Sequence, residues 1–449
     1  MRKVRITKGR NIPLKGAAAA DLQELPLPAE VAVPFFEFPP HCLRLLVKEG
    51  DALQVGSPLA EDRRDPRVVV VSPVSGTVRT VKRGDKRALL SVRISTDGRQ
   101  EKLLRPRFDP GQLSGLSRDE LLDRLVGGGV WPFIRQRPFD RVADPKIAPK
   151  SIFVRALNTD PLAPDVDILL QGKEDDFQAG LEILRKLTPG PVCLCFGESA
   201  RSRALREARH VESVVFSGPH PAGNVGTHVH HLDPLGKGEA VWFLEAQDVP
   251  RLASLLFQGV FDPGQTVAVT GEGAAFRRHV RTVLGAQVSH LLGGPAVDGV
   301  RYLSGSVLSG YEVSLDDSVG IYASQLTALP AGGTRKFLGW AGPRFGEFTF
   351  SRMIGGGLFP APEVSLDTDN HGSERAVVLN DVYDGLQALD VLTFFLLRAI
   401  LAGEVQEMVR LGILECSPED FALCTFACPS KVDVSGVIRQ GLELIEKEG

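Results

Sequence analysis

Two short β-rich segments near the N-terminus echo each other, and they constrain the fold more than any other feature of the chain. One contains Lys48-Glu49-Gly50-Asp51 and the other Lys82-Arg83-Gly84-Asp85. Each stands beside short apolar runs, and such runs broken by Gly-Asp turns are typical of antiparallel strands. The repeat therefore predicts a compact barrel-sandwich of two similar halves over residues 1–100.

The tip between the two halves carries only arginine as a basic residue. The segment resembles biotinyl and lipoyl carrier domains, in which this tip bears an acylated lysine. Here the tip is residues 61–67, with Arg63, Arg64 and Arg67, and the chain has no lysine between Lys48 and Lys82. A guanidinium stays protonated and does not form the required amide. We predict the carrier fold without its acceptor lysine.

Length, charge and cysteine content limit the class of protein. A chain of 449 residues implies roughly two to four domains. Its formal net charge of −3 gives no reason to expect nucleic acid as a partner. No apolar stretch approaches the ~18 residues of a membrane span, and the N-terminus has no signal-peptide core. Six cysteines in so long a chain form no disulfide framework, which predicts a reduced, cytoplasmic protein.

The pattern changes to alternating strands and helices after a linker. Residues 117–125 are expected to form a helix capped by Ser117, and an apolar face with the spacing of a helix runs from Phe177 to Leu187. A basic helix is expected around residues 199–209. The expected strands are residues 151–156, 167–170, 191–196, 211–216 and 240–244. This alternation predicts a Rossmann-like, doubly wound α/β domain over residues 101–258.

Two further regions complete the predicted organisation. Residues 259–330 contain short runs (287–292, 301–305 and 319–322) that indicate a small β-rich module. Residues 331–449 begin with glycine-rich turns such as 355–357 and become helical from about Gln387. Ser417-Pro418 is a strong helix start. One apolar face of a terminal helix is formed by Val434, Val437, Ile438, Leu442 and Ile445.

Two glycine loops are weak candidates for a nucleotide site. Gly271-Glu-Gly273 follows an expected strand, but Phe276 fills the position at which close helix packing needs a small residue. Residues 218–226 form a glycine loop without the Lys-Ser/Thr pair that grips phosphates. Tight turns explain both loops better.

The loop at residues 226–234 holds three of the nine histidines. As a strand, it would place His228 and His230 on one face, a spacing that can chelate zinc, with Asp233 as an oxygen donor. No nearby cysteine or glutamate completes a tetrahedral set. Histidines hydrogen-bonded within a loop at the sheet edge are the favoured interpretation.

The tail cysteines resemble the end of an iron–sulfur motif. Cys424-x-x-x-Cys428-Pro matches the last part of the bacterial motif, but Phe421 and Leu423 stand where inner thiolates are needed. With Cys416, the tail indicates a cluster domain that has lost its metal. Cys193 and Cys195 are expected on opposite sides of a buried strand, as packing residues. No catalytic, cofactor-binding or metal-ligating residue is assigned, and the residues alone indicate a multidomain scaffold of a redox assembly.

The four regions occur together in the NqrA family, whose members are subunits of the sodium-translocating NADH:quinone reductase. The chain resembles that family in short strings at residues 8–16, 83–92, 226–230, 232–234, 281–286, 303–310 and 418–429. The acidic stretch at residues 367–375 departs from the family pattern. The resemblance implies a Rossmann-like central domain, an SLBB-like β-grasp module over residues 259–330 and a degenerate iron–sulfur region at the C-terminus.

The resemblance also implies a function. It implies a peripheral subunit on the cytoplasmic face of the bacterial inner membrane, in a complex that passes electrons from NADH to ubiquinone and exports sodium. Flavins and the iron–sulfur centre would belong to companion subunits, and ubiquinone is a candidate ligand of the chain. The alternative is an electron-entry subunit, similar to RnfC or to the flavin-bearing subunit of complex I, that binds flavin and NADH itself. The missing glycine fingerprint and missing cysteines favour the first function.

Overall fold

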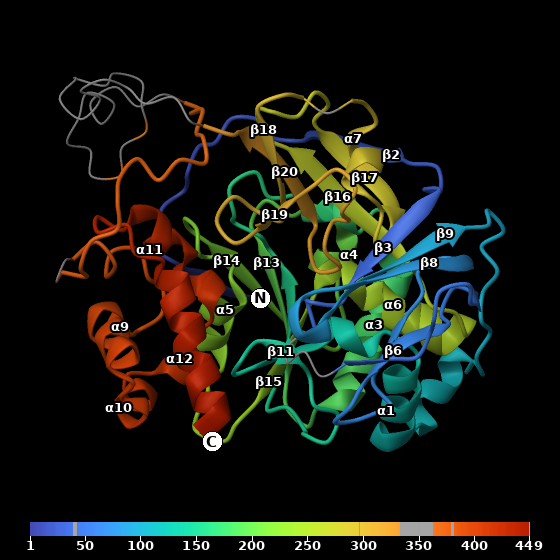
Figure 1. Cartoon of the computed structure of the whole chain (residues 1–449). Coiled ribbons are helices and arrows are strands. Elements are labelled where there is room, and N and C mark those ends of the chain that lie inside the picture. The colour runs from blue at the N-terminus through green and yellow to red at the C-terminus, as the bar shows by residue number, and fades with distance from the viewer. Residues whose placement is uncertain are drawn as a thin grey trace.

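The structure is a computed structural model that describes residues 1–38, 43–295, 297–332, 348, 350, 362–378 and 381–448. Figure 1 shows four regions: a β-sandwich, a central α/β domain, a second β-rich module above it, and a group of C-terminal helices on the opposite side from the sandwich. Among the described residues, no helix is both long and apolar enough to cross a bilayer.

The predicted sandwich is present and consists of two antiparallel sheets. One sheet has the order β3 (Glu30–Pro34), β9 (Leu89–Thr96), β8 (Gly76–Arg83) and β5 (Ala52–Leu53), and the other β4 (Leu43–Leu45), β6 (Pro58–Asp62) and β7 (Val69–Val71). Alternating apolar residues such as Val31, Val92 and Ile94 are buried between them. This alternation places one side of each strand in the core.

The α/β domain is built on a seven-stranded sheet. Its order is β1 (Arg2–Arg5), β14 (Glu212–Ser217), β13 (Val192–Gly197), β12 (Ile152–Ala156), β15 (Val241–Glu245), β10 (Arg135–Arg137) and β11 (Arg141–Val142). The first five strands are parallel, β10 is antiparallel to β15, and β11 is antiparallel to β10. The chain order of the strands reverses between β12 and β15. A doubly wound sheet binds its ligand at the carboxyl ends of the strands beside such a reversal.

Helices cover one face of this sheet as predicted, with some changes. Helix α1 (Arg118–Gly127) is capped by Ser117, and α3 (Glu174–Leu187) buries the predicted apolar face against α6 (Val249–Ala253). The predicted strand at residues 167–170 is wrong: α2 (Val166–Leu169) stands there because Asp165 caps the backbone N–H of Asp167. The predicted basic helix shortens to α4 (Arg203–Arg206).

The second β-rich module has a six-stranded sheet. Its order is β19 (Tyr311–Val313), β18 (Val300–Ser304), β20 (Gln325–Pro330), β16 (Gly264–Thr270), β17 (Arg278–Val283) and β2 (Ala19–Glu24). Residues 287–292 were predicted as an extended run, but α7 (Val288–Leu292) is a short helix that ends at Gly293 with φ +61°. Its apolar residues pack into the same core as those of the strands.

The first 24 residues contribute to two sheets outside the sandwich. Strand β1 pairs in parallel with β14, with Val4 beside Phe216. Strand β2 pairs with β17, with Leu22 beside His279. The N-terminus therefore ties the α/β domain to the second β-rich module.

The C-terminal region is helical, as predicted. It contains α9 (Thr393–Ala402), α10 (Val405–Arg410), the 3-10 turn η7 (Pro418–Phe421), α11 (Ala422–Ala427) and α12 (Val434–Glu448). The five residues of the predicted terminal face are all buried in α12. Ser417 and Asp420 form a capping box at the predicted helix start. The glycine-rich turn at residues 355–357 lies outside the described residues.

Candidate functional site

A cluster of charged side chains lies at the carboxyl ends of the parallel strands, beside the reversal of strand order. Arg155 is on β12 and Glu245 ends β15, and the Nη1 of Arg155 is 3.3 Å from the Oε1 of Glu245. Asp160, in the loop after β12, is 4.0 Å from Arg155 and 3.7 Å from the Nδ1 of His220. Parallel strands bring these residues together because their carboxyl ends share one edge.

The C-terminal region enters this edge of the sheet. Turn η7 brings the Oδ2 of Asp420 within 3.5 Å of the Nη1 of Arg137, and the Oε1 of Glu419 within 3.8 Å of Arg137 and of Arg155. Arg137 ends β10 and is 1% exposed. Two carboxylates from the tail therefore face two arginines from the α/β domain.

The geometry of these ion pairs is loose. Among the described residues, the Nε and Nη1 of Arg137, the Oε1 of Glu419 and the Oδ1 of Asp420 are buried without a hydrogen-bond partner. Pairs at 3.5–3.9 Å are longer than charge-assisted hydrogen bonds. Burial of a charged group without such bonds is costly, and the tail carboxylates satisfy Arg137 only in part.

Burial also changes proton affinity in the cluster. It raises the pKa of Glu245 to about 7, although Arg155 acts in the opposite direction. It raises the pKa of Asp420 above the usual range of an aspartate and lowers that of His220. These shifts follow from desolvation of the charged forms.

The glycine loop at residues 218–226 leads directly into this cluster. It connects β14 to helix α5 (Val225–Leu232), whose N-cap is Asn224. The carboxylate of Asp420 lies against Gly226 in the first turn of α5, where a Cβ would stand 2.2 Å from its Oδ2. A carboxylate at the start of a helix is favoured by the helix dipole. The loop is thus a glycine loop that leads into a helix, with a side chain of the same protein at the helix start.

The three histidines lie on helix α5, so the expectation that they lie in a loop was wrong. Residues two apart on a helix point to different sides, so His228 and His230 do not form the strand-like zinc pair. His228 is buried against Phe216, with its Nε2 3.0 Å from the carbonyl oxygen of Ala222. His230 contacts Glu415 at 2.8 Å. Among the described residues, no group of three or more His, Cys, Asp and Glu side chains has the arrangement of a metal site.

The Gly271 loop is a tight turn, which is the interpretation that the sequence favoured. It joins β16 to the antiparallel strand β17 rather than to a helix. Gly271 has φ +95°, and a Cβ there would stand 2.0 Å from the carbonyl oxygen of Ala328. The turn needs glycine because of its positive φ and the close approach of Ala328. Because the loop leads to a strand and not to a helix, it is not a dinucleotide fingerprint.

Two arginines of the sandwich tip pair with aspartates. Arg64 pairs with Asp62, and Arg67 pairs with Asp65 at 2.8 Å and with Asp123 of α1 at 2.9 Å. The last contact fastens the tip to the α/β domain. A carrier tip has to move between sites, and this one is docked.

The five cysteines that the structure describes are buried packing residues, with one correction to the prediction. Cys193 and Cys195 share one face of β13, because residues two apart on a strand point to the same side; the expectation of opposite sides was wrong. Cys416, Cys424 and Cys428 are buried in the C-terminal core. Burial raises the pKa of the Cys424 thiol to about 12.

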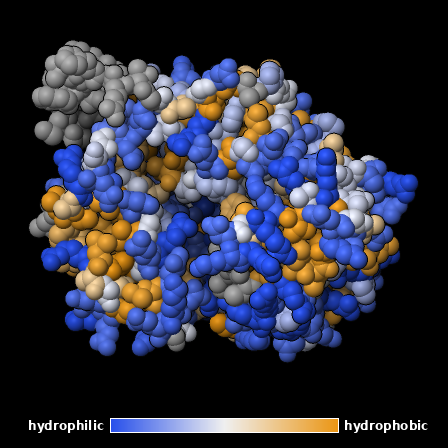
Figure 2. Space-filling view, viewed as in Figure 1, coloured by the Kyte–Doolittle hydropathy of each residue, from blue (hydrophilic) through white to orange (hydrophobic). Residues whose placement is uncertain are grey.

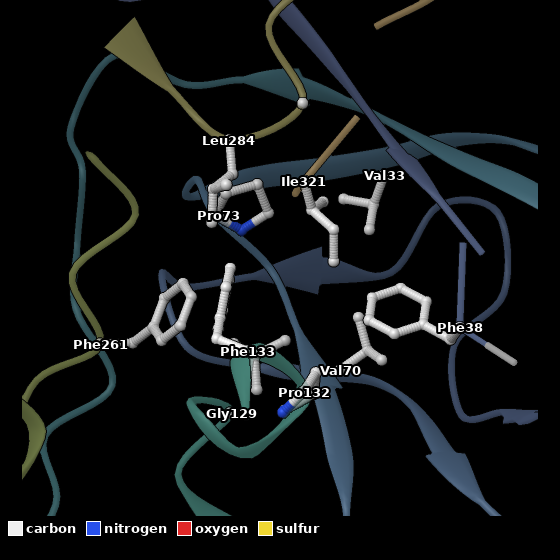
Figure 3. A pocket seen from close by; sticks show the side chains of 12 residues that line it. Val33, Phe38, Val70, Pro73, Gly129, Pro132, Phe133, Phe261, Leu284 and Ile321 are labelled. Carbon is white, nitrogen blue, oxygen red and sulfur yellow. The ribbon is translucent and has the colours of Figure 1, made fainter. Parts of the chain in front are cut away.

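A small apolar cavity lies where the sandwich, the α/β domain and the second β-rich module meet. Figure 3 shows Phe38, Phe133, Phe261 and Ile321 around it. The cavity volume open to a water-sized sphere is about 20 Å³. A benzene ring needs a cavity of roughly 150 Å³, so this space is a packing defect at a domain junction and not a ligand pocket.

Sequence reasoning missed the charged cluster. Its signal was present, since Arg155 and Glu245 each interrupt an apolar strand at its carboxyl end, where buried strands seldom carry charge. The partners Glu419 and Asp420 were recognised only as helix-start residues. Nothing local places them beside Arg137, which is more than 280 residues away in the sequence.

Comparisons with known proteins match the chain along most of its length. Residues 4–97 match the NqrA N-terminal barrel-sandwich hybrid domain, residues 116–261 the NqrA second alpha/beta domain and residues 266–314 the NQRA C-terminal domain.

Relatives match over their full length. The NqrA subunit of the Na(+)-translocating NADH-quinone reductase of Neisseria meningitidis is 36% identical over 99% of this chain and 100% of its own. That of Pasteurella multocida is 37% identical with the same coverage. That of Rhodopirellula baltica is 36% identical over 99% of this chain and 98% of its own. Among solved structures, an air-oxidized NAD+-reducing [NiFe]-hydrogenase is 15% identical over 71% of this chain and 64% of that chain, with a TM-score of 0.37, too low to support an argument.

Proposed function

The chain belongs to the NqrA family of Na+-translocating NADH-quinone reductase subunits, and from that premise we propose that it supports the quinone-reduction step without a redox cofactor of its own. The observation that carries the proposal is the filled edge of the α/β sheet. Glu419 and Asp420 occupy the edge at which a doubly wound domain would receive a flavin or dinucleotide.

The buried tail thiols support the same proposal. Iron–sulfur clusters are held by thiolates, and burial raises the pKa of the Cys416 and Cys424 thiols, which disfavours that charged form. Cys428 instead contacts the hydroxyl of Tyr383 at 3.0 Å. We assign flavin, iron–sulfur and NADH chemistry to companion subunits, and ubiquinone to the complex as its electron acceptor.

We propose that the chain is peripheral, at the cytoplasmic face of the bacterial inner membrane, and that α9 contacts another subunit. Leu392, just before this helix, and Phe395 and Leu401 within it are 58%, 50% and 58% exposed. Figure 2 shows the hydrophobic side chains gathered over this part of the surface. Exposed apolar side chains that gather on one part of a surface are characteristic of a protein–protein contact. The partner would be a subunit of the same complex with an apolar surface.

The proposal is tested by separating NADH oxidation from quinone reduction. The purified chain, supplied with flavin, should oxidise NADH no faster than flavin alone. A complex assembled without the chain should still pass electrons from NADH to an artificial acceptor but lose sodium-dependent quinone reduction. Turnover of NADH by the isolated chain, in proportion to bound flavin, would replace this proposal with the electron-entry function.

A further inference from the structure

Three positive features converge at the filled edge of the α/β sheet. Arg137 comes from β10, Arg155 from β12, and the first turn of α5 adds backbone N–H groups at the positive end of a helix dipole. A glycine loop that leads from a strand into a helix, beside an arginine at the carboxyl end of a parallel strand, is an arrangement that binds phosphate groups in doubly wound domains. Arg137 comes from the antiparallel strand β10, and its guanidinium faces Glu419, which Arg155 also faces, and Asp420, which lies against Gly226. The arrangement lacks the lysine of a P-loop, but it has two arginines, which bind phosphate with two parallel hydrogen bonds.

The unpaired atoms indicate that the carboxylates of Glu419 and Asp420 fit poorly between the arginines. Arg137 is 1% exposed, yet its Nε and Nη1 donate to no acceptor in the described part of the chain. Both atoms belong to the side chain that faces the tail carboxylates, with Nη1 3.5 Å from Asp420. Glu419 and Asp420 also each leave an oxygen without a donor. A ligand with more oxygens, spread tetrahedrally, would satisfy these donors better than two separate carboxylates.

The charges of the neighbours lead to the same conclusion at Arg137, whereas Arg155 keeps Glu245 at 3.3 Å and Asp160 at 4.0 Å. Without Glu419 and Asp420, the remaining acidic partner of Arg137 is Asp140, at 3.9 Å. Asp140 is already paired with Arg135 at 2.7 Å. Arg137 would then be a buried cation without a full counter-charge, which attracts an anion strongly.

We propose that Arg137, Arg155 and the first turn of α5 form a binding site for a phosphate group, which the chain covers with the carboxylates of Glu419 and Asp420. The two carboxylates act as an internal substitute for the phosphate and hold the C-terminal helices on the α/β domain. The site becomes available when the segment around η7 withdraws. The proposal concerns recognition of the phosphate group and assigns it no redox role.

Pyrophosphate is the probe, because two linked phosphate groups can replace two carboxylates. Isothermal titration of the full-length chain would compare the wild type with Glu419→Ala/Asp420→Ala at matched ionic strength. The double variant is expected to bind one pyrophosphate at least tenfold more tightly than the wild type. Addition of Arg137→Gln to the double variant should abolish that gain. Asp390→Ala/Glu404→Ala, which removes two exposed acids of the C-terminal region, is the matched control and should bind like the wild type.

Glu419→Ala alone provides a variant that does not depend on the capping role of Asp420. The Glu419 side chain is 26% exposed and makes only long ion pairs, so its removal should leave the fold intact. Glu419→Ala should bind pyrophosphate more tightly than the wild type, by less than the double variant does. If the double variant does not fold, Glu419→Ala takes its place in the comparison. The proposal is wrong if the folded variants bind pyrophosphate no better than the wild type. It is equally wrong if the gain persists with Arg137→Gln, because the anion would then bind elsewhere.

Discussion

Arg155 and Glu245 face each other across the reversal of strand order in the α/β sheet, with the guanidinium Nη1 3.3 Å from the carboxylate Oε1. Glu245 is nevertheless desolvated enough that its pKa lies near neutrality. The titration of Glu245 therefore reports on the burial of this edge of the sheet and can be measured.

The stability of the chain should depend on pH through Glu245. Burial raises its pKa to about 7, so the folded chain holds this proton more tightly than the unfolded chain. The contribution of this protonated carboxyl to the free energy of unfolding is complete below the ordinary glutamate pKa of about 4.5 and is lost as the pH rises to about 7. Relative to Glu245→Gln, the wild type should lose on the order of 2–3 kcal/mol of unfolding free energy between about pH 5 and 7.5. Urea titrations of both proteins at each pH measure this, and parallel pH profiles would contradict it.

Substitution of Gly226 should loosen the C-terminal region. The new Cβ of Gly226→Ala would stand 2.2 Å from the Oδ2 of Asp420. Alanine favours a helix by up to ~1 kcal/mol, whereas overpacking costs about 1–3 kcal/mol, so net destabilisation is expected. Limited proteolysis should cleave residues 411–433 sooner than in the wild type. Gly115→Ala is the control, since nothing lies within 4 Å of its Cβ position; equal proteolysis of the two variants would refute the contact.

The sandwich tip should carry no lipoyl or biotinyl group. Its arginines cannot form the amide, and Arg67 is held by Asp65 and Asp123. Intact-mass spectrometry of protein from the native host should give the unmodified mass. A lipoyl or biotinyl adduct mapped to residues 61–67 would sink this prediction.

The tail cysteines should bind no iron–sulfur cluster. Cys424 is 1% exposed and its thiol stays protonated at neutral pH, whereas cluster ligands are thiolates. Anaerobically purified chain should be colourless, with no stoichiometric iron or acid-labile sulfide. A brown protein whose colour disappears in Cys424→Ser, and not in Cys193→Ser, would overturn the assignment.

The outward face of α9 should matter for assembly and not for folding. Phe395→Glu places a charge on a side chain that is 50% exposed, so the free energy of unfolding should change by less than about 0.5 kcal/mol. Recovery of the chain with its complex from membranes should fall several-fold. Leu104→Glu, at another exposed apolar residue, is the matched control. Normal recovery of Phe395→Glu with the complex would rule out this surface as the contact.

Local patterns in the sequence determined the type and place of many elements. Short apolar runs broken by Gly-Asp turns predicted the sandwich, and the spacing from Phe177 to Leu187 predicted α3. All five residues of the predicted apolar face of α12 are buried. These signals are reliable because the period of the apolar residues follows directly from the geometry of a strand or a helix. Short segments were less predictable: residues 167–170 and 287–292 are helical, since capping and packing decide a four- or five-residue apolar run.

Tertiary structure alone decided the partners of distant segments. Strands β1 and β2 were not predicted individually from the sequence, and only the assembled domains place them in two different sheets. Likewise, Glu419 and Asp420 carry a local signal for a helix start, but their contact with Arg137 depends on how the C-terminal helices dock. The physical reason is that hydrogen bonding and side-chain periodicity act over a few residues, whereas ion pairs and strand pairing between remote segments depend on the packing of whole domains.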